Sequence, residues 1–505
     1  LHQIAGIVTR FDIIRNAHTP RLVGSDPDAP MNRSTVDQPS SPSEGQIVQA
    51  SHGVTAGMDA KSRSQHYGVR DAAFQATAQG SGEQYFSAFA LLLHASPFQI
   101  GILSALPQLV GVVAQLISVK LLQYLHVPGQ LLIAGGWAQA LCWLPILSLP
   151  LFLPEYGPWL FIGCAVLYFA FGHATTPIWN SLLVDVVEQD SRGAYFARRA
   201  RTTALTSFLA LGIAGAVLTL GQKWGINWIG FLIIFLVAAT ARVGATRCQT
   251  KVSTLVPVHR IDAPHGFRHF LTKTATRDYR CFLLFCGLMH FAVLLSGPFF
   301  VIYLLRDLHW SYLQYAGWMA SSISAQFLTL GPWGHIGDRY GNKTLLALTA
   351  SAVPLLPMGY LLSEQYLFLL ILNFFGGVIW AGLSLGLQNY VFDSLRPEER
   401  TRGVALANAM NAVGWGLGAL TGSWLATVLP AQLSFGQWHV TPASNLPFLF
   451  CLSGALRLII AVGLLRTFDE PRRITSVPQG HLLWQLPLVK PLTALLSWKS
   501  PRVVP

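Results

Sequence analysis

Charged side chains are scarce in this chain of 505 residues, of which only 11% are Asp, Glu, Lys or Arg and 52% are hydrophobic. A soluble globular domain carries about 25% charged residues. Glycine (45 residues) and tryptophan (15) are abundant, and helices in lipid use glycine for close packing and tryptophan at the interfaces. The composition therefore excludes an ordinary soluble enzyme and favours a membrane protein.

Motifs that carry catalysis or hold a metal are also missing from the sequence. It has no phosphate-binding P-loop and no HEXXH zinc motif, and none of its six cysteines forms a CxxC pair. His259, His265 and His269 do not form a convincing ligand set. We therefore expect no cofactor, no bound metal and no enzymatic activity.

The basic excess does not indicate nucleic-acid binding. The net charge is +12, a balance that is typical of nucleic-acid partners when it gathers on one domain. Here the basic residues lie between apolar runs instead. We expect no nucleic-acid partner.

Twelve predominantly apolar runs follow one another from about residue 73, each close to the roughly 20 residues that a spanning helix needs. They predict an all-α membrane protein with twelve transmembrane helices in two pseudo-symmetric six-helix bundles. The runs lie near 73–94, 98–121, 130–151, 158–184, 199–220, 226–246, 281–304, 312–333, 344–362, 366–392, 404–429 and 446–466.

Basic residues follow every second run, whereas the other connections offer little beyond Lys223 and Arg306. The positive-inside rule places the basic connections in the cytoplasm, so both termini are expected inside, in a bacterial inner membrane. The basic set is Lys120, Arg192, Arg198, Arg199, Arg201, Arg247 to Arg280, Arg339, Lys343, Arg396, Arg400 and Arg402.

The runs divide the chain into five parts. Residues 1–72 are polar and lack apolar periodicity, which predicts a disordered cytoplasmic tail. Met31 offers an alternative start, which would make residues 1–30 an over-extension. The remaining parts are an N-terminal bundle (73–248), a basic cytoplasmic linker (249–276), a C-terminal bundle (277–468) and a cytoplasmic tail (469–505).

The two bundles carry matching features in the same order. Ala114-Gln115 matches Ala325-Gln326, Asn180 to Asp185 matches Asn389 to Asp393, Arg192-Gly193 matches Arg402-Gly403, and Arg242 matches Arg457, with offsets of about 209–215 residues. Four ordered pairs indicate a duplicated six-helix unit. Parallel six-helix repeats are typical of one large transporter architecture, with the substrate site between the halves.

The stretch from Gly334 to Lys343 (GHIGDRYGNK) resembles the cytoplasmic signature loop of the major facilitator superfamily, G-x-x-x-D-R-x-G-R-K. Asn342 stands where the family usually has Arg, and the first-half copy is eroded to Lys120 through Pro128-Gly129. Acidic-then-Arg-Gly segments at 185–193 and 393–403 also resemble loops of this family. The resemblance covers about residues 73–468 and leaves the substrate open.

The resemblance implies a cytoplasmic gate, whose charges clamp the two halves in one state and separate in the other. Gly341 is expected to permit a sharp turn, and Gly334 and Gly337 a close backbone approach. The alternative is a solvated turn that carries topogenic charges. The gate candidates are Gly334, Gly337, Asp338, Arg339, Gly341, Lys343, Asp185, Arg192, Asp393 and Arg402.

Glu83 stands out among the 22 acidic residues because it falls well inside an apolar run. A charge at that depth costs about 2.5–3.5 kcal/mol on insertion scales, so we expect Glu83 to face the space between the halves and to exchange protons or bind substrate. A structural hydrogen bond to a neighbouring helix is the alternative.

Other polar residues inside the runs are weaker candidates. His290 and His173 can titrate near neutral pH, although a hydrogen-bonded core histidine is the more common case. Amide side chains either line a polar path or bridge helices, at about 0.6 kcal/mol a bond. The amide candidates for coupling or substrate binding are Asn180, Gln388 and Asn389, and Gln108, Asn408 and Asn411 belong to the same class.

Together these features predict a secondary transporter that moves a small solute by alternating access, coupled to protons, with a slight preference for efflux because no second charge pair is visible at mid-depth. The expected partners are the lipid bilayer, a small-molecule substrate and protons, and the expected state is a monomer. Two alternatives remain, a non-transporting sensor or interaction platform and an intramembrane enzyme, for which Glu83 and His290 alone give thin support.

Overall fold

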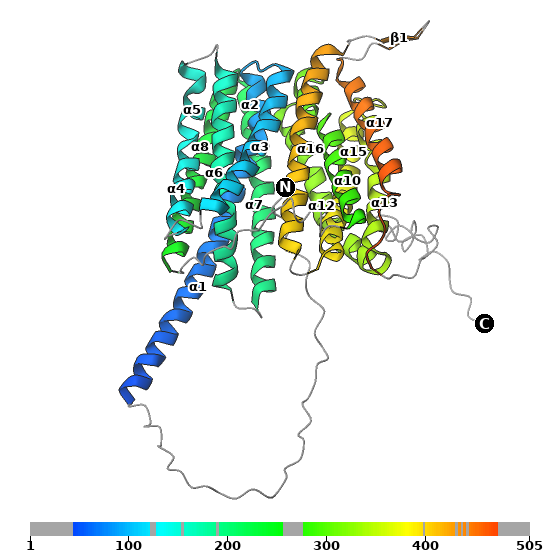
Figure 1. The fold of residues 1–505 in the computed structure, drawn as a ribbon. Helices are drawn as coiled ribbons and strands as arrows, with labels where there is room; N and C mark the ends of the chain where they lie inside the picture. The colour runs from blue at the N-terminus through cyan, green and yellow to red at the C-terminus, as the bar shows by residue number, and fades with distance from the viewer. Residues whose placement is uncertain are drawn as a thin grey trace, which may run out of the picture.

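The computed structural model describes residues 44–121, 128–152, 156–187, 191–255, 276–396, 399–429, 433–435, 438–440 and 444–472. Its helices form twelve rods that stand side by side in two bundles (Figure 1). A short hairpin of β1 (Leu433–Phe435) and β2 (Trp438–Val440), with Leu433 opposite Val440, projects from one end.

The N-terminal bundle holds the first six rods. The first rod is α1 (Glu44–Ser81), η1 (Glu83–Tyr85) and α2 (Phe86–Leu92), and the third is α4 (Pro128–Leu141) with α5 (Trp143–Phe152). The other four rods are single helices: α3 (Pro97–Leu121), α6 (Gly157–Val186), α7 (Arg192–Lys223) and α8 (Asn227–Leu255).

The C-terminal bundle repeats this plan. Its first rod is α10 (Arg277–Leu294), α11 (Phe299–Ile302) and η4 (Tyr303–Asp307), and its third is α13 (Asn342–Ala352) with α14 (Leu355–Gly359). The single helices are α12 (Tyr312–Tyr340), α15 (Tyr366–Ser394), α16 (Arg400–Val428) and α17 (Leu446–Leu464). The predicted order of two six-helix units is confirmed.

Apolar composition explains why these segments are helical, because a helix satisfies its own backbone in lipid. Eight of the described rods are long and apolar enough by themselves to cross a membrane. The other four, which contain α1, α12, α13 and α16, are more polar or are interrupted. They complete the bundles by packing against apolar neighbours.

The predicted boundary of the N-terminal tail at residue 72 is wrong. Helix α1 begins at Glu44 and continues through the polar stretch to Ser81. Ser64 and Asp71 are completely buried in it. Polarity misled the prediction because Asp71 finds polar partners inside the bundle, Arg199 and Gln249, rather than water.

The first rod of each bundle is interrupted at a corresponding place. In the N-terminal bundle the α-helix changes to the 3₁₀ turn η1 at Glu83. In the C-terminal bundle α10 ends at Leu294, and a turn through Pro298 precedes α11. Broken helices at membrane depth free backbone groups, which must find partners within the protein.

Close packing in the C-terminal bundle depends on glycines of α16. A Cβ atom on Gly414, Gly418 or Gly422 would come within 2.1–2.2 Å of a backbone oxygen of the first rod of that bundle. Only glycine allows this backbone approach. These glycines therefore set the distance between α16 and the first rod of the bundle.

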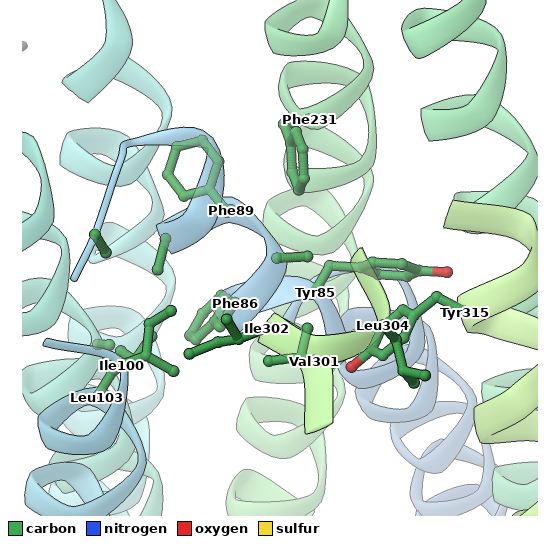
Figure 2. Close-up of a cluster of buried hydrophobic side chains, with 14 of the residues drawn as sticks. Tyr85, Phe86, Phe89, Ile100, Leu103, Phe231, Val301, Ile302, Leu304 and Tyr315 are labelled. Carbon is green, nitrogen blue, oxygen red and sulfur yellow. The ribbon is translucent and has the colours of Figure 1, made fainter. Parts of the chain in front are cut away.

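The buried cores show where the bundles meet. One core joins both bundles: Tyr85 and Phe86 of the first rod lie close to Val301, Ile302 and Tyr315 of the C-terminal bundle (Figure 2). Two other cores each belong to a single bundle, at the opposite ends of the rods. They comprise Leu132, Ile178 to Val187, Tyr195 and Val252 in the N-terminal bundle, and Tyr279 to Ala292, Leu383 to Leu395 and their neighbours in the C-terminal bundle.

Candidate functional site

Glu83 lies at the interruption of the first rod, where its carboxylate turns into the N-terminal bundle. The hydroxyl of Tyr168 on α6 donates a 2.7 Å hydrogen bond to Glu83 Oε1. The preceding residue, Gly82, packs so closely on Trp143 and Ala238 that a Cβ would clash with both. Glu83 is partly exposed, and Tyr85 of the same turn is the residue that reaches the other bundle. The alternative expectation, a hydrogen bond to a neighbouring helix, is confirmed, whereas a role of Glu83 in proton exchange or substrate binding stays a prediction.

A second buried carboxylate, Asp71, lies three turns before Glu83 on α1. It accepts hydrogen bonds from Arg199 (3.3 Å) and Gln249 (3.0 Å). Arg242 is only 2% exposed, and its guanidinium acts electrostatically on both Asp71 and Glu83. The N-terminal bundle thus contains a hydrogen-bonded cluster of Arg199, Asp71 and Gln249, and the charge of Arg242 acts both on this cluster and on Glu83.

Arg457 of α17 occupies the corresponding place in the C-terminal bundle. It is 3% exposed and donates to Ser296 Oγ (2.8 Å) and to the backbone oxygens of Val293 (3.3 Å) and Val353 (3.4 Å). Each bundle therefore places a buried arginine of its sixth rod at the interruption of its first rod. Both arginines are buried inside their bundles.

The two histidine candidates lie apart from this cluster. His290 is buried, and its Nδ1 atom is 2.9 Å from the backbone oxygen of Cys286 one turn earlier. His173 packs against α3, where a Cβ on Gly111 would come within 2.5 Å of its ring. Both histidines thus pack against helix residues.

The amide candidates lie on α6 and α15. Asn180 is exposed, whereas Gln388 and Asn389 are partly buried. Within the part of the chain that the structure describes, the buried atoms Gln388 Oε1 and Asn411 Oδ1 have no hydrogen-bond partner. These acceptors are available to a polar ligand or water.

The signature loop forms the predicted sharp turn between α12 and α13. Gly341 has φ +87°, which is a glycine conformation. A Cβ on Gly337 would lie 3.0 Å from Asn342 Oδ1, so this glycine does permit a close approach. Gly334 has open space around it, and the prediction that it serves close packing is wrong.

The charges of the signature loop are paired within the C-terminal bundle. Arg472, beyond α17, contacts Asp393 through Nε (2.8 Å) and Nη2 (2.9 Å) and lies 4.0 Å from Asp338. Asn342 donates to the same Asp393 carboxylate at 2.5 Å. Lys343 binds Asp469 at 2.6 Å. Asp338, Lys343 and Asp393 are thus brought together, whereas Arg339 lies over the ring of its neighbour Tyr340 (5.4 Å).

The gate candidates at the other acidic loops serve local structure. Arg192 donates to the backbone oxygens of Val184 and Val187 (both 3.2 Å) and so caps α6, near Asp185. Arg402 is partly buried on α16. The adjacent Gly403 packs against Leu395, and its oxygen accepts from Tyr279 at 2.9 Å.

Four contributors to these sites were not predicted: Asp71, Tyr168, Asp469 and the pairing role of Arg472. Asp71 was hidden by its polar sequence neighbours, and Tyr168 is one aromatic among many. The acidic-basic run Asp469-Glu470-Pro-Arg472 directly after an apolar run was the one available signal.

Comparison with known proteins agrees with this architecture. The family model of the Major Facilitator Superfamily matches residues 281–504. A comparison with curated protein sequences finds no match.

Several solved transporters have a similar fold at 13% sequence identity. A bacterial homologue of the iron transporter ferroportin in its inward-facing state superposes with a TM-score of 0.65, over 80% of this chain and 98% of that one. The D-xylose-proton symporter gives 0.58 (82% and 99%), and the nucleoside transporter NupG gives 0.57 (81% and 99%). The chain thus resembles the Major Facilitator Superfamily over residues 281–504 and shares its fold with solved transporters rather than with enzymes. Its apolar helices make it an integral, multi-pass membrane protein.

Proposed function

We propose that this protein moves a small solute across the membrane by alternating access, and that the structure represents its inward-open state. The observation that carries the proposal is the one-sided contact between the bundles. Among the described residues, they share a large buried core at the end away from the signature loop and a small one at Ala105, Leu294 and Ala419. At the loop end each bundle has a core of its own.

Two helix pairs form the closed side. On α3 and α16, Gly101 packs against Ser423, and Trp415 donates to the backbone oxygen of Ser104 at 3.3 Å. On α7 and α12, Thr219 Oγ1 accepts the backbone N–H of Leu313 at 2.8 Å. These contacts must separate for the solute site to open to the other side.

The gate charges are free to close the opposite side. Asp338 at the end of α12 has an 80% exposed side chain, and Arg198 and Arg201 at the start of α7 are exposed. Rocking of the bundles brings these helix ends together, so that opposite charges meet across the interface. Exposed pairs of this kind contribute about 0.2–1 kcal/mol each, which suits a contact that forms and breaks in every cycle.

Proton coupling is assigned to Glu83. Its carboxylate is held by Tyr168 and lies within range of Arg242, at the point where the first rod is interrupted. Protonation would remove the attraction to Arg242, weaken the hydrogen bond from Tyr168, and so let the interruption change shape. The other candidates, His290, His173, Asn180, Gln388 and Asn389, remain possible contributors to substrate binding.

The preference for efflux is withdrawn from the proposal. It depended on the lack of a second charge inside the bundles, and Asp71, Arg242 and Arg457 are all buried. The proposal therefore includes no direction. We also propose that the protein lies in the plasma membrane with both termini in the cytoplasm, because this orientation puts the basic connections on the cytoplasmic side.

The test begins with a thermal-shift screen of the purified protein against small solutes, followed by flux of each hit in reconstituted vesicles under a pH gradient. We expect gradient-driven flux that Glu83→Gln uncouples from the gradient. Glu364→Gln, which neutralises an exposed acid before α15, is the matched control. Unchanged proton dependence in Glu83→Gln would remove that role from Glu83.

The competing function is a transporter-shaped sensor or platform. The eroded signature loop of the first half favours it. In that case the screen would find ligands that stabilise the protein, but none of them would cross the vesicle membrane.

A further inference from the structure

Residues Asp469 to Arg472 follow the end of α17, and we call them the strap. The strap lies against the signature loop and the end of α15. Lys343 donates its ammonium to Asp469 (2.6 Å) and its backbone N–H to Glu470 (2.7 Å). The hydroxyl of Tyr390 donates to the backbone oxygen of Asp469 at 2.7 Å.

Arg472 is the most strongly placed residue of the strap. It contacts both oxygens of Asp393 with a planar, two-pronged geometry that arginine provides and lysine does not. The Asp393 side chain is only 14% exposed, so water does little to solvate its charge. Arg472 therefore supplies the cation for an acid that is largely shielded from water.

The loop itself cannot supply that cation. Asn342 occupies the position beside Asp393 where the signature pattern has a basic residue, and its neutral amide gives Asp393 a single donor. Asp338 lies near the same guanidinium at 4.0 Å. Two acids of the gate thus depend on one arginine that comes from outside the loop.

We propose that the strap is a working part of the gate, in which Arg472 replaces the missing guanidinium at position 342. Because the strap continues α17, it ties the sixth rod of the C-terminal bundle to the turn between its second and third rods. The signature loop then moves with α17 as one body. This gating role rests on the proposed transport function, whereas docking of the strap does not.

Docking is tested in the full-length protein by cross-linking. The six native cysteines, which are unpaired in the structure, are first replaced. Lys343→Cys and Asp469→Cys are then introduced. We expect a short bifunctional thiol reagent to cross-link the two cysteines efficiently, and Arg472→Ala to lower this cross-linking about threefold to tenfold. Arg466→Ala, an exposed arginine at the end of α17, is expected to leave it unchanged. Equal cross-linking with and without Arg472 would overturn the proposal.

The gating role is tested by compensation. Arg472→Ala is expected to lower flux about tenfold, and adding Asn342→Arg to this variant is expected to restore most of the flux but not the cross-link. Loss of the cross-link with unchanged flux would show that the strap docks without acting on the gate, which contradicts the proposal. No flux in the unmodified protein would contradict the proposed function, while the cross-linking result would still decide the docking.

Discussion

The hydroxyl of Tyr168 donates a 2.7 Å hydrogen bond to the carboxylate of Glu83, and so links α6 to the interruption of the first rod. The same carboxylate lies within range of Arg242. In the C-terminal bundle Arg457 holds the interruption through Ser296 and backbone oxygens, and within the described residues none of these partners is acidic. The two bundles share a plan, but only the N-terminal one places a proton-binding group at the interruption.

Tyr168→Phe is expected to weaken both stability and coupling. The ring keeps its packing against Phe86 and Trp143, so the change isolates the hydrogen bond. The free energy of unfolding is expected to fall by between about 0.6 kcal/mol, which is typical of a hydrogen bond between membrane helices, and about 3 kcal/mol, which is typical of a hydrogen bond to a charged group. Thermal unfolding in detergent measures it, with the exposed Tyr156→Phe as control. Stability and coupled flux equal to the unmodified protein would show that the bond does not form.

Arg457→Met is expected to destabilise the C-terminal bundle by about 3 kcal/mol, because it leaves Ser296 and the oxygens of Val293 and Val353 with one donor fewer each. Removing a buried charge is stabilising in itself. The backbone oxygens at the interruption nevertheless lose their donor, and we expect this loss to be the larger effect. The stability of Arg457→Lys should lie between those of the unmodified protein and Arg457→Met. Unfolding temperatures compared with Arg466→Ala test this, and a more stable Arg457→Met protein would refute it.

Gly101→Ala is expected to shift the protein away from the inward-open state. Its Cβ would lie 2.2 Å from Ser423 Cβ on the closed side of the interface, so the bundles must separate there. Gly212→Ala is the matched control, because nothing lies within 4 Å of its Cβ position. The distance between spin labels at positions 198 and 338 should be shorter in Gly101→Ala than in the unmodified protein, and unchanged in Gly212→Ala. Identical distributions in both variants would contradict the assignment of the closed side.

The strap is expected to stay docked throughout the physiological pH range. Lys343 donates to Asp469 and lies beside it, which lowers the pKa of that carboxyl below its ordinary value of 3.8. A lowered pKa means that the pair contributes fully above about pH 4 and is lost as the pH falls through the lower, folded value. The mobility of a spin label at Thr467 should therefore be constant from pH 8 to about pH 4.5. Release near neutral pH would assign pH sensing to the strap.

Apolar patterning was sufficient to predict the fold, because lipid requires that each span satisfy its own backbone. The twelve runs, the repeat and the turn at Gly341 were all recognisable in the sequence. The prediction failed where polar residues are buried through tertiary contacts. Asp71 lies in a polar sequence and becomes buried only when Arg199 and Gln249, more than 120 residues away, fold against it.

The candidate site was harder to predict than the fold for a related reason. Glu83 was found because its neighbours are apolar, but the direction of its side chain depends on whether the rod is regular at that point, and the 3₁₀ turn changes it. Arg472 was recognised only as a topogenic charge, because its pairing with Asp393 spans 79 residues and two helices.

Locking the closed side tests alternating access most directly. Thr219→Cys and Leu313→Cys, whose native residues are joined by a 2.8 Å hydrogen bond between the bundles, are introduced into a protein without its other cysteines. We expect oxidation to stop flux of an identified substrate in vesicles and reduction to restore it. Flux that continues at full rate through completely cross-linked protein would contradict the account.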